Sequence, residues 1–147
     1  MTESFSAEDW RVLPLRGFDE LRVGEVFKSA SRTMTEANFA AFQTVSLDNH
    51  PIHYDDEYCK RLGHPGPLAH GLQVLSFTAA GAGLFPHVIG EKLIGFIEVN
   101  AKFLKAVFPG DTLELEYGRE PSGVLQFAVR TPRDELAITH GVAEVDP

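Results

Sequence analysis

The second half of the chain alternates hydrophobic and polar residues with a period of two. Four such stretches predict strands, over residues 97–103, 113–117, 125–129 and 136–145. A period of two places successive side chains on opposite faces of a strand, so that one face is buried and the other is wet. Between the first two stretches, Pro109 and Gly110 stand where a type II turn needs them. This half of the chain therefore predicts a run of antiparallel strands.

The first half predicts a strand and then helices. Residues 26–34 alternate charged residues with smaller ones, which favours a strand. Thr35 is a suitable N-cap and Glu36 is an acidic residue in the first turn, so a helix should begin there. That helix should end near Ser46.

A loop and a short helix are predicted next. Pro51 prevents the first helix from continuing, so residues 47–54 should form an irregular loop. Asp55 can cap a short helix that ends at Gly63.

The longest apolar stretch, residues 68–84, predicts a helix with apolar side chains on several faces. Such a helix should lie in the middle of the fold. The order of strand, helices and antiparallel strands predicts an α+β fold in which a sheet wraps one long buried helix. The 147 residues suit one domain, over 1–147, without an internal repeat.

Charge and composition exclude several classes of function. The formal charge of -8 argues against nucleic-acid binding, because phosphate contacts need a basic surface. Polar residues interrupt the longest apolar stretch, so we expect no membrane span, and residues 1–10 do not resemble a signal peptide. The single cysteine, Cys59, can form no internal disulfide and is expected to be a small buried hydrophobe. Together these features predict a cytoplasmic protein.

The candidate chemistry lies in the predicted loop, where Asp48 and His53 stand five residues apart with Pro51 between them. On a loop that bends at Pro51, both side chains can turn toward one point. A carboxylate and an imidazole can each exchange a proton with one water molecule, as general acid–base catalysis requires. From the spacing alone, a loop cap and an unrelated surface histidine remain an open alternative.

Three sequence blocks carry a resemblance to a known family. Ser46, Asp48 and Pro51-Ile52-His53 match a pattern that runs roughly Ser-Gly-Asp-x-Asn-Pro-[Leu/Ile]-His. Leu68-Ala69-His70-Gly71-Leu72 resembles an Ala/Val-His-Gly-Met/Leu segment at the start of a central helix, and residues 102–113 resemble a strand and turn with Gly-Asp-Thr-Leu. In this order the blocks resemble the MaoC-like dehydratases, also called the hydratase 2 or R-specific enoyl-CoA hydratase family, over most of residues 35–115.

The resemblance implies a hot-dog fold, in which a curved antiparallel sheet wraps a long central helix, and a homodimer or higher homo-oligomer. It also implies a hydratase that adds water reversibly to the α,β double bond of an enoyl-CoA, giving a 3-hydroxyacyl-CoA. Carried over by position, Asp48 and His53 hold and activate that water, and the backbone N–H of Gly71 polarises the thioester carbonyl. Ala69 and His70 should border the substrate, with His70 as a helix-start residue rather than a catalyst. The resemblance implies no cofactor besides the CoA thioester substrate.

Two positions depart from the family pattern. His50 stands where the family has asparagine, and Leu47 stands where it has glycine. Leu47 precedes Asp48, and His50 lies between Asp48 and His53. Both are expected to contact the substrate, so together they suggest an acyl group other than a plain short chain.

Other interpretations remain open. A metal site on His50 and His53 with nearby carboxylates lacks a complete ligand pattern, so we expect none. Some basic residues can meet CoA phosphates or simply be solvated, namely Lys60, Arg61, Lys102 and Lys105. Because hot-dog folds serve several functions, a thioesterase and a non-catalytic acyl-CoA-binding subunit are alternatives to the hydratase.

Overall fold

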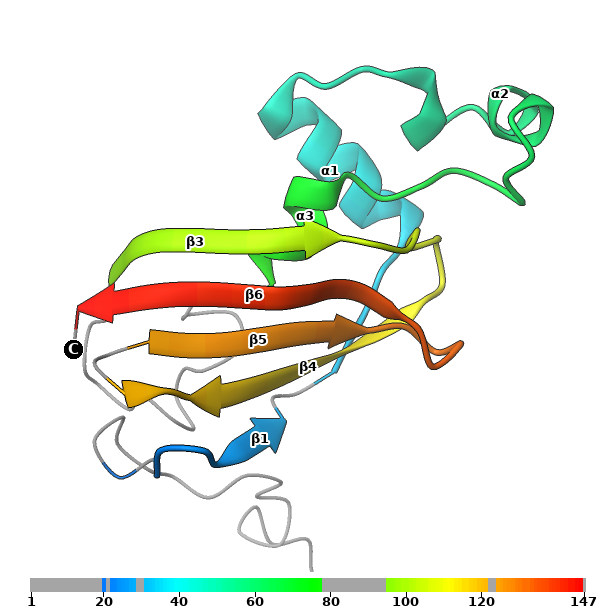
Figure 1. Ribbon diagram of the computed structural model, residues 1–147. Helices are drawn as coiled ribbons and strands as arrows, with labels where there is room; N and C mark the ends of the chain where they lie inside the picture. The colour runs from blue at the N-terminus through cyan, green and yellow to red at the C-terminus, as the bar shows by residue number, and fades with distance from the viewer. Residues whose placement is uncertain (1–19, 21, 29–30, 78–94, 122–123, 147) are drawn as a thin grey trace, which may run out of the picture.

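The computed structural model describes residues 20, 22–28, 31–77, 95–121 and 124–146 (Figure 1). The elements in chain order are β1 (Val26–Lys28), β2 (Arg32–Thr33), α1 (Glu36–Ser46), the 3-10 helix η3 (Pro51–His53), α2 (Asp56–Arg61), α3 (Gly71–Ser76), β3 (Gly95–Phe103), β4 (Thr112–Arg119), β5 (Val124–Arg130) and β6 (Leu136–Asp146). This order confirms the predicted α+β class.

The strands form one antiparallel sheet in the order β1-β4-β5-β6-β3, and β2 also pairs with β4. The three α-helices lie at the β3 end of this order, far from β1, with α3 next to β3 (Figure 1). Within the described part of the chain, β3 is therefore the end strand that borders the helices.

The predicted alternation is confirmed most clearly on β4. Leu113, Leu115 and Tyr117 are each at most 2% exposed, whereas Glu114 between them is exposed. The same holds on β5, where Phe127 and Val129 are buried. These side chains pack with Met34, Phe39 and Val74 into one hydrophobic core that joins the sheet to α1 and α3. The prediction is wrong at Phe103, which is 52% exposed because its ring lies over the start of α3 instead of in the core.

The helix caps are those that the sequence predicted. Thr35 accepts the Asn38 N–H at 3.2 Å and Asn38 Oδ1 accepts the Thr35 N–H at 2.9 Å, which is a reciprocal capping box. Asp55 accepts the Tyr58 N–H at 2.9 Å and so begins α2. The helices before and after the loop over residues 47–54 thus begin at their predicted N-caps.

The turn before β4 is also as predicted. Gly110 has a φ of 92°, which the third residue of a type II turn requires, and the Asp111 N–H donates to the Phe108 carbonyl at 3.1 Å. The Asp111 side chain then accepts two hydrogen bonds from Arg133, each at 2.7 Å. This ion pair ties the turn to the connection between β5 and β6.

Three predicted elements have different bounds. The strand over 26–34 consists of two short strands, β1 and β2, that pair with opposite ends of β4. The loop over 47–54 contains η3, because proline at the first position of a helical turn needs no N–H. The helix over 68–84 begins only at Gly71, and its predicted residues 78–84 lie outside the described residues.

Tertiary contacts explain the late start of α3. The Leu68 N–H donates to the Ile52 carbonyl at 2.9 Å, and the Ala69 N–H donates to the Val107 carbonyl at 2.8 Å. These bonds hold residues 68 and 69 in an extended segment between η3 and the strand region. An apolar pattern cannot distinguish such a segment from the first turn of a helix.

Candidate active site

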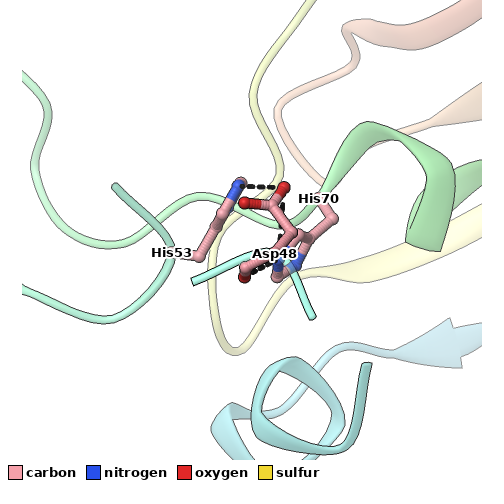
Figure 2. Close-up of side chains that lie close together, drawn as sticks. All are labelled: Asp48, His53 and His70. Carbon is pink, nitrogen blue, oxygen red and sulfur yellow. Dashed lines mark hydrogen bonds and ion pairs between the residues drawn. The ribbon is translucent and has the colours of Figure 1, made fainter. Parts of the chain in front are cut away.

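Three side chains meet at one point from three separate segments (Figure 2). Asp48 lies on the loop after α1, His53 is the last residue of η3, and His70 is the N-cap of α3. The Asp48 Oδ2 atom lies 3.5 Å from His53 Nε2 and 3.8 Å from His70 Nε2. The predicted pair is therefore confirmed as neighbours, and a third residue joins it.

Local backbone geometry brings Asp48 and His53 together. The His50 N–H donates to Asp48 Oδ1 at 3.2 Å, and the His53 N–H donates to the His50 carbonyl at 3.1 Å. The His50 ring accepts the Ile52 N–H on its Nδ1 atom at 3.2 Å and so caps η3. The loop around Pro51 consequently turns both functional side chains toward each other.

The backbone carbonyl of Leu68 determines which nitrogen of His53 carries a proton. His53 Nδ1 lies 2.7 Å from this carbonyl oxygen, which can only accept, so Nδ1 is the donor. In the neutral ring, Nε2 then presents a lone pair toward Asp48 Oδ2. Two acceptors that face each other at 3.5 Å need a proton between them, from a protonated ring or from a bridging water.

The charge of Asp48 suits an acceptor role. The backbone N–H of His50 lowers the pKa of Asp48, against a smaller opposing effect of burial, and the neighbouring His53 lowers it further. The carboxylate is thus ionised at neutral pH. Its side chain is 50% exposed, so a small molecule from solvent can reach it.

His70 is a buried residue that contacts both Asp48 and His53. It is 3% exposed, its Nε2 lies 3.2 Å from the Asp48 carbonyl oxygen, and its ring stacks on His53 with centroids 3.6 Å apart. The ring of Phe42, on α1, packs against the His70 ring, with the two centroids 5.0 Å apart. The prediction of a helix-start histidine is confirmed, whereas its contact with Asp48 gave no signal in the sequence because 22 residues separate the two.

Ring geometry argues against one metal ion held by all three residues. Their ligand atoms lie within 4.8 Å of one another, so the cluster resembles a metal site by distance alone. An imidazole binds a metal in its own ring plane, yet the planes of His53 and His70 are stacked and only 20° apart. Two such planes do not meet close to either ring, so both lone pairs cannot point at one ion about 2 Å away.

Gly71 provides the first residue of α3, as the sequence predicted for the oxyanion donor. Among the described residues, its N–H has no hydrogen-bond acceptor, which is usual in the first turn of a helix. A Cβ atom on Gly71 would lie 3.1 Å from the Phe103 ring, so any other residue here needs that half-exposed ring to shift by a few tenths of an ångström.

A pocket of about 260 Å³ opens beside Gly71. Its walls are mainly apolar and comprise Leu68, Ala69, Gly71, Val74, Phe103, Leu104, Lys105, Ala106, Val107, Ala137 and Ile138. Asp48, His53 and His70 do not line it, so the pocket adjoins the three-residue cluster only through the segment over residues 68–71.

The remaining predicted residues have varied positions. Leu47 caps the C-terminus of α1 with a φ of 60°, and its side chain is 78% exposed. Lys60 pairs with Glu57 on the surface, and the Arg61 guanidinium lies 5.6 Å from the Tyr58 ring centre. Cys59 is fully buried, as predicted, and burial raises the pKa of its thiol, which suits a packing role.

An α+β fold with a carboxylate and a tautomer-fixed imidazole on one short loop has the groups needed for acid–base chemistry. A family model described as MaoC like domain matches residues 20–127. The chain belongs to this family, as its three motif blocks predicted.

Relatives and solved structures agree with this assignment. The chain is 28% identical to an (R)-specific enoyl-CoA hydratase of Rhodospirillum rubrum over 112 residues, covering 74% of this chain and 70% of that protein. It is 29% identical to the peroxisomal hydratase-dehydrogenase-epimerase of Saccharomyces cerevisiae over 126 residues, covering 86% of this chain and 13% of that protein. An (R)-hydratase from A. caviae involved in PHA biosynthesis superposes with a TM-score of 0.71 at 27% identity, covering 86% and 97% of the two chains. These likenesses confirm the hot-dog fold.

The chain spans only part of several relatives. It covers 13% of the yeast protein and 40% of a probable enoyl-CoA hydratase 2 from Dictyostelium discoideum. In the part of the chain that the structure describes, no helix is both long and apolar enough to cross a membrane.

Proposed function

We propose that this protein is an enoyl-CoA hydratase, which adds water reversibly to the α,β double bond of an enoyl-CoA to give a 3-hydroxyacyl-CoA. The observation that carries the proposal is the approach of two acceptors, Asp48 Oδ2 and His53 Nε2, to 3.5 Å. A water molecule can donate one proton to each, which exposes its oxygen lone pair to an electrophilic carbon. The names of the relatives support the same reaction.

In the hydration direction, the oxygen of the water bonds to the β-carbon while His53 removes a proton from that water. The π electrons move to the α-carbon and the thioester oxygen, giving an enolate. The Gly71 N–H stabilises the charge on that oxygen, and such a preorganised donor contributes on the order of 10²–10³ in rate. The α-carbon then receives a proton from the Asp48–His53 pair, so that the sum is the addition of one water.

Two surfaces of the protein favour binding of the acyl-CoA. The apolar pocket beside Gly71 can take an uncharged part of the substrate, and Lys105 on its wall can meet an anionic group. Leu47, which is exposed and next to Asp48 in the chain, can contact the acyl or pantetheine portion. No metal or other cofactor takes part in the proposed reaction, so a chelator should leave turnover unchanged.

We also propose a homodimer or a higher homo-oligomer. Two half-exposed apolar side chains, Phe103 and Leu104, lie at the end of β3, the end strand of the described sheet, and such residues favour a protein contact. Sedimentation velocity measures the oligomeric state, and a purely monomeric active protein would contradict this proposal.

Turnover of an enoyl-CoA panel tests the function, because hydration removes the absorbance of the conjugated thioester. A thiol reagent run in parallel would detect free CoA and identify a thioesterase instead. Thermal stabilisation by acyl-CoA esters without turnover of any of them would identify a non-catalytic binding subunit. Either result would contradict the hydratase proposal.

A further inference from the structure

The backbone of His50 forms hydrogen bonds to both Asp48 and His53 and so links the two residues. Its N–H binds the Asp48 carboxylate at 3.2 Å, and its carbonyl accepts the His53 N–H at 3.1 Å. Those two bonds are made by the backbone and need no particular side chain. The third bond, from the Ile52 N–H to His50 Nδ1 at 3.2 Å, depends on the ring.

This third bond requires a lone pair on Nδ1. In histidine, Nδ1 is bonded to Cγ, the place that Oδ1 occupies in asparagine, which is among the best N-cap residues. The neutral His50 ring can therefore cap η3 as an asparagine would. An imidazolium carries a hydrogen on both nitrogens, so its Nδ1 would present a donor to the Ile52 donor, and the cap would be lost.

We propose that His50 is a positioning residue for the Asp48–His53 pair and caps η3 only in its neutral form, so that protonation of His50 lowers the activity of the site. The inference rests on the proposed function for its activity readout. When the cap opens, the turn that ends in His53 loses its fixed start, and the Leu68 carbonyl and the His70 ring alone hold His53 Nε2 less firmly opposite Asp48 Oδ2. The freed cation also lies beside the Asp48 carboxylate and competes with water for it.

Several charged or titratable groups influence this switch. Asp48 on the same loop accepts the His50 N–H. From η3, the His53 ring faces the His50 ring with centroids 6.4 Å apart. From α2, the Tyr58 ring packs edge-on at 5.6 Å, and Arg61 lies against the same tyrosine. Because His50 and His53 are both histidines in the same site, a pH profile of the unmodified protein cannot assign the acid limb to either one.

Two substitutions separate capping from titration. His50→Asn keeps an acceptor for the Ile52 N–H and removes the titration, whereas His50→Ala removes both. His64→Asn is the matched control, because His64 also precedes a proline and lies outside the site. The kcat and KM for an enoyl-CoA are measured from about pH 8 to about pH 5.5, the range in which histidine changes charge.

At the alkaline end, we expect His64→Asn to keep kcat within about twofold of the unmodified protein, and His50→Asn to keep more of kcat than His50→Ala does. His50→Ala should lower kcat roughly 10-fold with little change in KM. This loss is expected because, without the cap, a smaller fraction of the molecules holds the Asp48–His53 pair in its active geometry. Toward acid, the ratio of His50→Asn activity to unmodified activity should rise, whereas that of His64→Asn should stay constant.

Three results would overturn the proposal. An unchanged kcat in His50→Ala would remove the positioning role. An unchanged acid limb in His50→Asn would assign the titration elsewhere. Equal losses in His50→Asn and His50→Ala at the alkaline end would show that the imidazole itself, and not its cap, is required. If His50→Ala does not fold, as judged by circular dichroism, the His50→Asn profile decides alone.

Nuclear magnetic resonance of the ligand-free protein separates this inference from the proposed function. The Ile52 amide resonance should shift with pH in parallel with the His50 ring nitrogens, and this shift should be absent in His50→Asn. An Ile52 amide that ignores the His50 titration would contradict the cap. If no enoyl-CoA is hydrated, the proposed function fails, whereas the Ile52 measurement still tests the switch.

Discussion

Asp48 and Asp111 each face basic side chains and accept one backbone N–H, but they differ in exposure and in how closely the basic groups approach. Asp111 is 7% exposed and accepts two hydrogen bonds from Arg133 at 2.7 Å and one from the Phe108 N–H at 2.9 Å. Asp48 is half exposed and lies 3.5 Å and 3.8 Å from two histidine rings, with one backbone N–H on its other oxygen.

The difference separates a structural carboxylate from one that is available for chemistry. The bonds of Asp111 are short and occupy both oxygens, so it fixes a turn and has little capacity left for another partner. The Oδ2 atom of Asp48 faces its imidazole neighbours at distances longer than a direct hydrogen bond and is open to solvent. An exposed, incompletely satisfied carboxylate beside an imidazole is suited to hold a reacting water.

The largest expected effect is that of Asp48→Asn on turnover. We expect kcat/KM for an enoyl-CoA to fall by roughly 10²–10⁴, because the amide is a poor proton acceptor, with little change in stability. Asp134→Asn is the charge-matched control, since that side chain is 90% exposed and distant in the turn before β6. If Asp48→Asn and the control Asp134→Asn turned over the substrate at comparable rates, the proposed catalytic role of Asp48 would be contradicted.

Breaking the ion pair between Asp111 and Arg133 should lower the stability of the protein and leave its turnover unchanged. Arg133→Ala leaves Asp111 buried without its cation, and we expect unfolding to become easier by about 2–3 kcal/mol, as for loss of charged hydrogen bonds. Thermal unfolding should show a decrease of roughly 5–10 °C. The control Arg130→Ala removes only surface pairs and should shift it little. A large loss of kcat in folded Arg133→Ala would make the two regions less separate than we infer.

The same pair should make stability depend on acid pH. Burial by itself would raise the pKa of Asp111, but the Arg133 hydrogen bonds and the Phe108 N–H outweigh it, so the pKa lies below the ordinary 3.8. A lowered folded-state pKa gives stability that is fully present above 3.8 and is lost as pH falls through the folded value. Melting temperatures measured between about pH 6 and about pH 2.5 should therefore fall less steeply in Arg133→Ala. Parallel curves would contradict this.

The smallest expected effects compare backbone strain in the two regions. Leu47 beside the site has a φ of 60°, and Gly110 in the structural turn has a φ of 92°. Leu47→Gly should stabilise the protein by about 0.5–1 kcal/mol, because glycine tolerates this conformation, whereas Gly110→Ala should destabilise it by a similar amount. Chemical denaturation measures both. If Leu47→Gly also raises KM, the strained leucine contacts the substrate, and an unchanged KM would remove that role.

Much of the secondary structure could be predicted because its causes are local. The caps at Thr35 and Asp55, the type II turn at Gly110 and the alternation on β4 each depend on residues a few positions apart. The Asp48–His53 pair was predictable for the same reason, since one short loop carries both side chains. The start of α3 was not, because residues 68 and 69 bond to distant carbonyls.

The sequence by itself thus determined the fold class, the family and the candidate pair of Asp48 and His53. Only the tertiary structure decided the state of that pair. The Leu68 carbonyl selects the His53 tautomer from 15 residues away, and His70 stacks on the ring from α3. Arg133 likewise reaches Asp111 across 22 residues. Hydrogen bonds at such separations depend on how whole segments pack, and no local pattern of residues records that packing.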